Sequence, residues 1–398
     1  MRRRSRTGGA SSSAPPSVSR GRPSEVERHV DAARRPHSPG PWWLAVRMAR
    51  RRGSAGRWQA HLVLLAASAL LLAACSAEGP QPVATPTPTA PARAVGESGV
   101  PAAVAFAPLR GTRADWAAMQ HPSLAAKIDN HEEARPQIGL NRADIVFEEF
   151  VEGGLTRYLA VWHSDIPAQI GPVRSIRPMD PDIATPFGGI IAYSGGQEQF
   201  VEMMQATPLV NVVFDFDDTG LFTRADERPG PHDVILDATE VLARNAELPP
   251  PAVQFAYGGT DPLSAPAFAA KPTSGISQVF SDERYPSWSW DAAASVWLRS
   301  QEGAPDFDDT GAQVQAVNVV TLRVDIDWRY GEVPKTVLVG RGEAWVSVGG
   351  RTAHGTWSKS AQAAPIVLTS DGGDPLLLAP GNTWIELVPT TGSVSFAP

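Results

Sequence analysis

The only cysteine in this 398-residue chain, Cys75, directly follows an uninterrupted apolar run over residues 62–74. Because there is no second cysteine, the fold cannot rely on an intramolecular disulfide or on a cysteine-based metal or redox centre. Any folded domain must therefore be stabilised by burial of apolar side chains. The apolar run itself is too short to cross a bilayer, because a membrane-spanning helix needs about 20 residues.

The sequence Leu72-Ala73-Ala74-Cys75 is typical of a bacterial lipobox, where an exported chain is cut before a lipid-modified cysteine. Five arginines between residues 47 and 57 precede the apolar run and complete the layout of an export signal. We therefore predict a signal peptide over residues 48–75, acylation of Cys75 with chains such as palmitate, and attachment to the extracytoplasmic face of the cell membrane. A signal peptide that is cut without lipidation is the alternative.

Two segments of biased composition flank this signal. Residues 1–47 are rich in Arg, Ser and Pro, so we expect a disordered extension, or a stretch that is not translated because synthesis starts at Met48. Residues 76–109 are rich in Pro, Thr and Ala, which favours extended chain of about 3.1 Å per residue. We predict that they form a tether, which could hold the folded part up to roughly 100 Å from the membrane.

Removal of the signal changes the charge of the chain. The first 74 residues contain 14 of the 35 Lys and Arg residues but 3 of the 42 Asp and Glu residues, which leaves 21 basic and 39 acidic residues and a formal net charge of −18. A surface of this charge repels nucleic acid and anionic lipid headgroups. We therefore exclude nucleic acid as a partner and expect contact with the membrane through the lipid anchor.

The rest of the chain, residues 110–398, is longer than one hydrophobic core usually serves. Three consecutive prolines at residues 249–251 end a helix predicted over residues 232–245 and mark a domain boundary. Before it, residues 110–250 mix strand and helix patterns, which predicts an α/β sandwich with a mixed sheet. After it, residues 251–398 show only short alternating runs, which predicts an all-β domain, either a β-sandwich or a partly open β-barrel.

The clearest local pattern is a hairpin of residues 144–152 and 155–163, joined at Gly153-Gly154. Glycine accepts the positive φ of a tight turn, and pairing Glu152 with Leu155 sets Ile145 opposite Trp162. Both faces of the hairpin are largely apolar, so we expect it to lie inside a sheet that is covered on both sides.

Several motifs follow one another along residues 110–398. They are Lys127-Ile128-Asp129-Asn130-His131, Ala134-Arg135-Pro136-Gln137, Val151-Glu152-Gly153-Gly154, Gly171-Pro172-Val173-Arg174-Ser175-Ile176-Arg177-Pro178, Gly355-Thr356-Trp357-Ser358-Lys359 and Pro380-Gly381-Asn382-Thr383-Trp384. In this order they resemble the YerB-like family of bacterial lipoproteins, known as domain of unknown function 3048 with N-terminal and C-terminal parts. The resemblance covers about residues 110–398 and implies an envelope lipoprotein with an α/β part followed by a β part; it supplies no established catalytic residue.

Arginine supplies most of the positive charge of the mature chain, with 17 Arg against 4 Lys. Because the planar guanidinium grips a carboxylate or phosphate at two points, we predict a cleft for an anionic ligand in the α/β domain. The alternative is that the arginines pair with Asp129, Asp144, Glu148 and Glu152 to satisfy a polar interior. The candidate binding residues are Asp129, Asn130, Arg135, Glu148, Glu152, Arg157, Arg174, Ser175, Arg177, Arg228 and His232.

Two functions fit these features. We favour a lipoprotein that binds a cell-wall component such as peptidoglycan, or a cell-wall synthesis protein, through the arginine-rich cleft. The alternative is a hydrolase or transferase acting on cell-wall polymers, whose chemistry would be carried by Asp129, Glu152, Ser194 or His232. The sequence assigns no catalytic residue, and we expect no cofactor.

One segment has the spacing of a calcium loop, with Asp215, Asp217, Thr219 and Asp226 as its ligands. The sequence around it is typical of strands rather than of the helices of such a loop, and Asp-Asp-Thr-Gly also favours an ordinary turn. The five histidines that follow Cys75 show no zinc-ligand spacing. We therefore predict no metal site.

Overall fold

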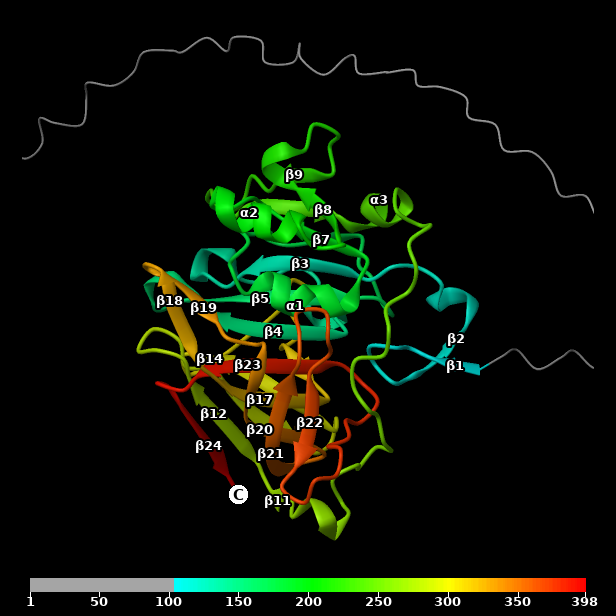
Figure 1. Ribbon diagram of the computed structural model, residues 1–398, viewed down its shortest axis with the longest axis vertical. Helices are drawn as coiled ribbons and strands as arrows, with labels where there is room; N and C mark the ends of the chain where they lie inside the picture. The colour runs from blue at the N-terminus through cyan, green and yellow to red at the C-terminus, as the bar shows by residue number, and fades with distance from the viewer. Residues whose placement is uncertain (1–103) are drawn as a thin grey trace, which may run out of the picture. The chain divides into compact units, whose positions relative to one another are not determined.

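The computed structural model describes residues 104–398, so the predictions for the signal peptide, Cys75 and most of the tether lie outside the described residues. Most regular structure in them is β-strand, and eleven strands form one large mixed sheet (Figure 1). Its order is β11-β21-β20-β17-β23-β4-β5-β3-β7-β8, with β22 paired to β21. None of the helices within this part of the chain is long and apolar enough to span a bilayer.

Residues 110–250, the first segment, and residues 251–398, the second segment, both contribute strands to this sheet. Those of the first segment are β3 (Leu124–Asp129), β4 (Ile145–Phe150), β5 (Thr156–Trp162), β7 (Ile190–Tyr193) and β8 (Val210–Val213). Those of the second segment are β11 (Lys271–Pro272), β17 (Asn318–Val324), β20 (Gly340–Val348), β21 (Arg351–Lys359), β22 (Val367–Ser370) and β23 (Thr383–Pro389).

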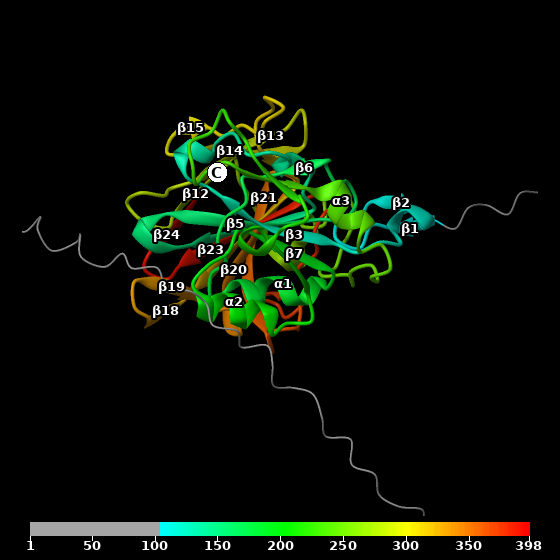
Figure 2. The same ribbon diagram turned by 90° about the horizontal axis from the view of Figure 1, so that it is seen from above.

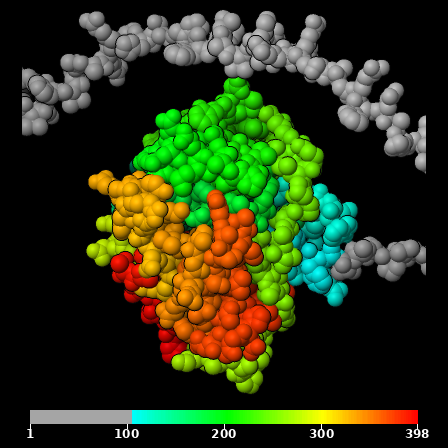
Figure 3. Space-filling model, viewed as in Figure 1, coloured from blue at the N-terminus to red at the C-terminus, as the bar shows by residue number. Residues whose placement is uncertain are grey.

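The two segments are joined where β4 pairs in parallel with β23, from Ile145 opposite Thr383 to Glu148 opposite Glu386. Both strands are almost wholly buried, including their glutamates, as expected where both faces of a parallel pair are covered. The two segments therefore form one compact unit, and Figure 3 shows them in close contact, green against orange and red.

A second sheet of six strands comes from the second segment and packs on one face of the large sheet. The packing is made by Trp288 and Trp297 of the smaller sheet against Trp384 and Tyr158 of the larger one. The second segment is thus made of strands in several sheets, and no closed barrel forms within residues 104–398. The strands of the smaller sheet are β12 (Gly275–Val279), β13 (Ser287–Asp291), β14 (Val296–Gln301), β15 (Ala304–Pro305), β16 (Gln315–Ala316) and β24 (Ser393–Ala397).

Short helices cover both faces of the large sheet in the first segment (Figure 2). On one face, α1 (Asp180–Ala184) and α2 (Glu198–Gln205) bury Ile183, Phe200 and Met204 in the core. On the opposite face, α3 (Ala238–Ala243) buries Ala238 and Val241. The smaller pairings are β1 (Val104–Phe106) with β2 (Arg113–Asp115), β6 (Gln169–Ile170) with β10 (Val234–Asp237) and β9 (Phe222–Arg224), and β18 (Ile326–Tyr330) with β19 (Val333–Thr336).

The predicted hairpin forms as β4 and β5, but its register was wrong by one residue. Ile145 lies opposite Val161, and Val151 rather than Glu152 pairs with Leu155. The turn therefore contains three residues, because both glycines adopt positive φ angles, 69° at Gly153 and 76° at Gly154. The prediction that both faces of the hairpin are covered is confirmed.

The helix predicted over residues 232–245 was wrong in its first half. Val234–Asp237 is strand β10, and the helix α3 begins at Ala238. Asp237 caps it, since its side chain accepts a hydrogen bond of 2.9 Å from the backbone N–H of Glu240. The all-β character predicted for the second segment holds, because no α-helix lies within residues 251–398.

Candidate anion-binding site

The parallel strands β3 and β7 separate at their carboxyl ends. They pair as far as Ala126 and Ala192, and beyond this point residues 172–176 lie between them. The inserted segment hydrogen-bonds to both sides: Arg174 N–H donates to Lys127 O at 2.8 Å, and Ser194 N–H donates to Arg174 O at 2.9 Å. Ligands of open α/β sheets bind where neighbouring strands diverge in this way, at the carboxyl edge.

Three arginines, Arg157, Arg174 and Arg177, meet at this edge and are called the arginine cluster below. Two of them have carboxylate partners, as the alternative interpretation of the sequence expects. Arg174 Nε lies 3.0 Å from Asp129 Oδ2, and Arg177 Nε lies 2.7 Å from Glu152 Oε2. Burial would raise the pKa of Asp129, but Arg174 and a hydrogen bond from His232 lower it below its usual range.

Arg157 is different. It lies at the start of β5, its Nη1 is buried, and no ion pair or hydrogen bond of its guanidinium is found within residues 104–398. Burial lowers the pKa of Arg157 to about 10; the charges of Arg177 and Arg174 act in the same direction, and those of Asp129 and Glu152 only partly offset them. A partly buried cation whose inner nitrogen has no hydrogen-bond partner is costly, so this position is suited to an incoming anion.

The arginine cluster rests on a buried ion-pair network that the sequence analysis missed. Lys127, in the middle of β3, is fully buried and pairs with Glu149 and, at 2.8 Å, with Asp180 Oδ1. Burial lowers the pKa of Lys127 to about 8, which the charge of Asp180 only partly offsets. The sequence does contain a signal for this network: Lys127 lies among apolar residues of a strand, and a lysine buried in this way needs a carboxylate partner.

Two small side chains lie beside the arginine cluster, where β7 leads into α2. Ser175 Oγ and Ser194 Oγ are 3.3 Å apart. Gly195 has a φ of 149°, and a Cβ there would lie 1.8 Å from Asp215 Oδ2, so only glycine lets that carboxylate approach. The serine hydroxyls can donate hydrogen bonds to a bound anion, but Ser194 has no base in the described contacts.

Three of the predicted site residues belong to a separate network on the opposite face of the hairpin. Glu148 is fully buried and pairs with Arg299 of β14. Asn130 donates to Gln301 Oε1 at 3.0 Å, and Arg135 donates to the same oxygen at 3.0 Å. These contacts link the two segments through the interior, which indicates a structural role rather than ligand binding.

The remaining predicted residues, Arg228 and His232, lie on one loop. Arg228 donates to Ala134 O at 2.6 Å and to Pro136 O at 2.7 Å, so it ties this loop to the segment after β3. His232 is buried, and its Nδ1 lies 2.6 Å from Asp129 Oδ2. Asp129 is thus shared between His232 and Arg174 of the arginine cluster.

The segment with calcium-loop spacing forms a turn. Asp217 Oδ1 accepts hydrogen bonds from the backbone N–H of Thr219 at 3.0 Å and from its hydroxyl at 2.6 Å. Among residues 104–398, the one group of three or more His, Asp or Glu side chains close enough to share a metal ion is His131, Glu133 and His232, which includes neither Asp215 nor Asp226.

His354, on β21, differs from His232 in that both of its ring nitrogens face carboxylates of exposed residues. Its Nδ1 lies 2.8 Å from both carboxylate oxygens of Asp371, and its Nε2 lies 3.0 Å from Glu343 Oε1. Burial alone would lower its pKa, but the two hydrogen-bonded carboxylates raise it above 6.5. A cavity of about 710 Å³ beside this histidine is lined by His354, Trp345 and Phe396.

We expect an NMR titration to place the pKa of His354 above 6.5 and that of His163, which burial lowers, below it. The ion pairs of His354 then stabilise the fold fully below pH 6.5, and this contribution is lost as the pH rises through the folded-state pKa. Asp371→Asn should move the pKa of His354 back toward 6.5. A pKa of His354 that is at or below that of His163 would contradict the described contacts.

The fold and the cluster define a β-rich protein whose two segments share one mixed sheet, with arginines gathered where two parallel strands of that sheet diverge. The chain belongs to the DUF3048 family. Models described as "Protein of unknown function (DUF3048) N-terminal domain" and "Protein of unknown function (DUF3048) C-terminal domain" match residues 109–250 and 276–385.

Two similar proteins come from comparison with known sequences and structures. The chain is 30% identical over 319 residues to a Bacillus subtilis (strain 168) protein named "Putative lipoprotein YerB", a match that covers 73% of this chain and 88% of the relative. The crystal structure of YerB protein from Bacillus subtilis superimposes with a TM-score of 0.64 at 25% identity, covering 73% of this chain and 99% of that structure. The resemblance stated from the motifs is therefore confirmed.

Proposed function

We propose that this protein is a lipid-anchored envelope lipoprotein that binds an anionic component of the cell wall, such as the carboxylates of a peptidoglycan stem peptide, through the arginine cluster. The observation that carries the proposal is the buried Nη1 of Arg157, which has no hydrogen-bond partner within residues 104–398, while the neighbouring Arg174 and Arg177 pair with carboxylates. The lipobox at Cys75 and the name of the Bacillus subtilis relative support the envelope location.

The chemistry of the cluster supports binding more than catalysis. A bound carboxylate could accept two hydrogen bonds from Arg157 and further ones from Ser175 and Ser194, whose hydroxyls have only each other as partners in the described contacts. A serine nucleophile would need a base, yet the Nε2 of His232 faces Glu133 Oε2 at 3.4 Å, and neither serine hydroxyl contacts a histidine within residues 104–398. The second candidate function, a hydrolase or transferase acting on wall polymers, therefore lacks an activated nucleophile at this edge.

The test uses the full chain with Cys75→Ser, so that it is not lipidated, and soluble muropeptides as the ligand. We expect calorimetry to detect binding, and Arg157→Ala and Ser194→Ala each to weaken it by about ten- to hundredfold, the cost of one charge-assisted hydrogen bond. Arg113→Ala is the control, because Arg113 is exposed and lies on β2, outside the large sheet. Equal affinities in all four proteins would rule out the cluster.

Mass spectrometry of the same mixtures separates the two functions. Unchanged muropeptides after prolonged incubation are expected for a binding protein. Turnover that is lost in His232→Ala or Glu152→Gln would instead establish the enzyme.

A further inference from the structure

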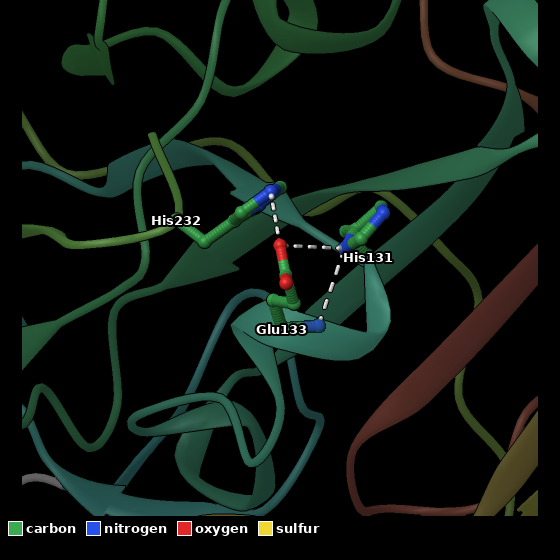
Figure 4. Close-up of side chains that lie close together, drawn as sticks. All are labelled: His131, Glu133 and His232. Carbon is green, nitrogen blue, oxygen red and sulfur yellow. Dashed lines mark hydrogen bonds and ion pairs between the residues drawn. The ribbon is translucent and has the colours of Figure 1, made fainter. Parts of the chain in front are cut away.

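Three side chains that can bind a metal ion come together beside the arginine cluster. They are His131 and Glu133, which follow β3, and His232 from the loop before β10 (Figure 4). One ligand atom from each lies within 4.8 Å of the other two. Both histidines face the same carboxylate oxygen: Glu133 Oε2 is 3.4 Å from His232 Nε2 and 3.9 Å from His131 Nδ1.

Hydrogen bonds to the backbone hold the segment after β3 and the loop before β10 next to each other, although the two are distant in the sequence. His131 caps a short 3-10 helix, Glu132–Ala134, and this helix places Glu133 next to the His131 ring. The rings of His131 and His232 stack with their centroids 4.4 Å apart and their planes 18° from parallel. Arg228 holds the His232 loop in place through its hydrogen bonds to Ala134 O and Pro136 O.

The environment of His232 is that of a metal ligand. Its Nδ1–H donates to Asp129 Oδ2 at 2.6 Å, which leaves the lone pair of Nε2 directed at Glu133. A carboxylate in this position fixes the tautomer of a ligating histidine and increases its basicity. Asp129 is kept anionic because Arg174 Nε also lies 3.0 Å from Oδ2.

We propose that His131, Glu133 and His232 bind a divalent cation of the zinc class. Two imidazoles and one carboxylate suit Zn²⁺ and related transition metals, whereas Mg²⁺ and Ca²⁺ prefer oxygen ligands alone. Three protein ligands leave a coordination position open to water or an anion. The side chains of His131 and Glu133 are 33% and 56% exposed, so they are free to close around an ion, and Glu133 N–H then gives up its 3.2 Å bond to His131 Nδ1.

This inference does not depend on the proposed function, although Asp129 contacts both sites. Asp129 Oδ2 joins His232 to Arg174, so an ion at the histidines would lie close to the arginine cluster. An anion held by the arginines could then also approach the open coordination position. The two proposals fail separately, because zinc binding and muropeptide binding are measured with different probes.

The experiment is calorimetric titration of the chelator-treated full chain with Zn²⁺, with Cys75→Ser throughout so that no thiol competes. We expect His131→Ala and Glu133→Gln each to remove one bound ion per chain or weaken its binding at least tenfold. Asp129→Asn should weaken binding by about 10- to 100-fold, as substitutions behind a ligating histidine do. Excess Mg²⁺ should not displace Zn²⁺ from the site.

His354→Ala is the matched control, because both nitrogens of this histidine already face carboxylates and are not directed at one common point. The comparison between variants also removes any contribution of His29, His37 and His61, which precede the described residues. Co²⁺ should give a visible absorption band that His131→Ala abolishes and His354→Ala leaves unchanged. No Zn²⁺ binding, or identical binding in the His131, Glu133 and unsubstituted chains, would overturn the proposal.

Discussion

Substitution of Arg299 by methionine is expected to lower the free energy of unfolding by about 3–5 kcal/mol, the cost of removing one partner from a buried ion pair. Arg299 is fully buried on β14, and its guanidinium pairs with Glu148 of β4 and, at 2.5 Å, with Asp306 Oδ2. Methionine keeps most of the volume, so the loss is one of charge rather than of packing. Both carboxylates would remain buried without their cation.

The surroundings of Arg299 increase this cost. Its guanidinium lies over the Trp384 ring, 4.9 Å from the centroid, in the layer between the two sheets. Glu386 is a further buried carboxyl nearby, and burial together with the charge of Glu148 raises its pKa well above its usual range. Loss of Arg299 would leave Glu148 and Asp306 without a cation in this layer, where burial already opposes the ionisation of a third carboxyl.

Urea denaturation followed by circular dichroism measures the effect. Arg329→Met is the control, because Arg329 is 68% exposed and solvent screens its pair with Asp327. Adding Glu148→Gln to Arg299→Met should recover part of the loss, since one unpaired carboxylate is removed. A loss below about 1 kcal/mol would show that this pair does not stabilise the contact between the two segments.

The hairpin shows how far the sequence predicts this fold. Its existence and its two covered faces follow from apolar residues at successive positions, a local pattern. Its register depends on whether the turn contains two residues, Gly153 and Gly154, or also Glu152. Glycine allows the backbone angles of either turn. The positive φ of both glycines and the pairing of Val151 with Leu155 decide it, and neither can be derived from composition.

The sequence contains a signal for the start of α3 that the prediction did not use. The apolar spacing of Ile235, Ala238 and Val241 suits a helix over the whole stretch, but Ile235 belongs to strand β10. Asp237 followed by Glu240 has the spacing of a capping box, which predicts the helix start at the observed place.

The candidate site was predictable in its residue types but not in its grouping. Arg157, Arg174 and Arg177 were predicted to share one cleft and do meet, because β3, β5 and β7 are neighbours. Glu148 and Asn130 were grouped with them, although they lie on the opposite face of the hairpin. His131 and His232 lack any metal-ligand spacing in sequence, and only the approach of two distant loops brings them together.

The same methionine substitution at Arg157 is expected to have the opposite effect on stability. Arg157→Met removes a cation whose buried Nη1 has no partner within the described chain, so the free energy of unfolding should stay unchanged or rise by up to about 3 kcal/mol, the cost of one unsatisfied buried donor. Its lowered pKa of about 10 has the same cause, since burial and the charges of Arg177 and Arg174 oppose the protonated form. Muropeptide binding should fall at least tenfold in the same variant.

These opposite outcomes distinguish an arginine that maintains the fold from one that is kept for a ligand. A residue retained at a cost in stability is expected where the fold serves binding rather than packing. Urea denaturation of Arg157→Met and Arg299→Met under identical conditions provides the comparison, with muropeptide titration of both variants. If Arg157→Met lost more than about 1 kcal/mol, its guanidinium would be part of the structural network around Lys127 and Glu149, and the anion-binding role would not stand.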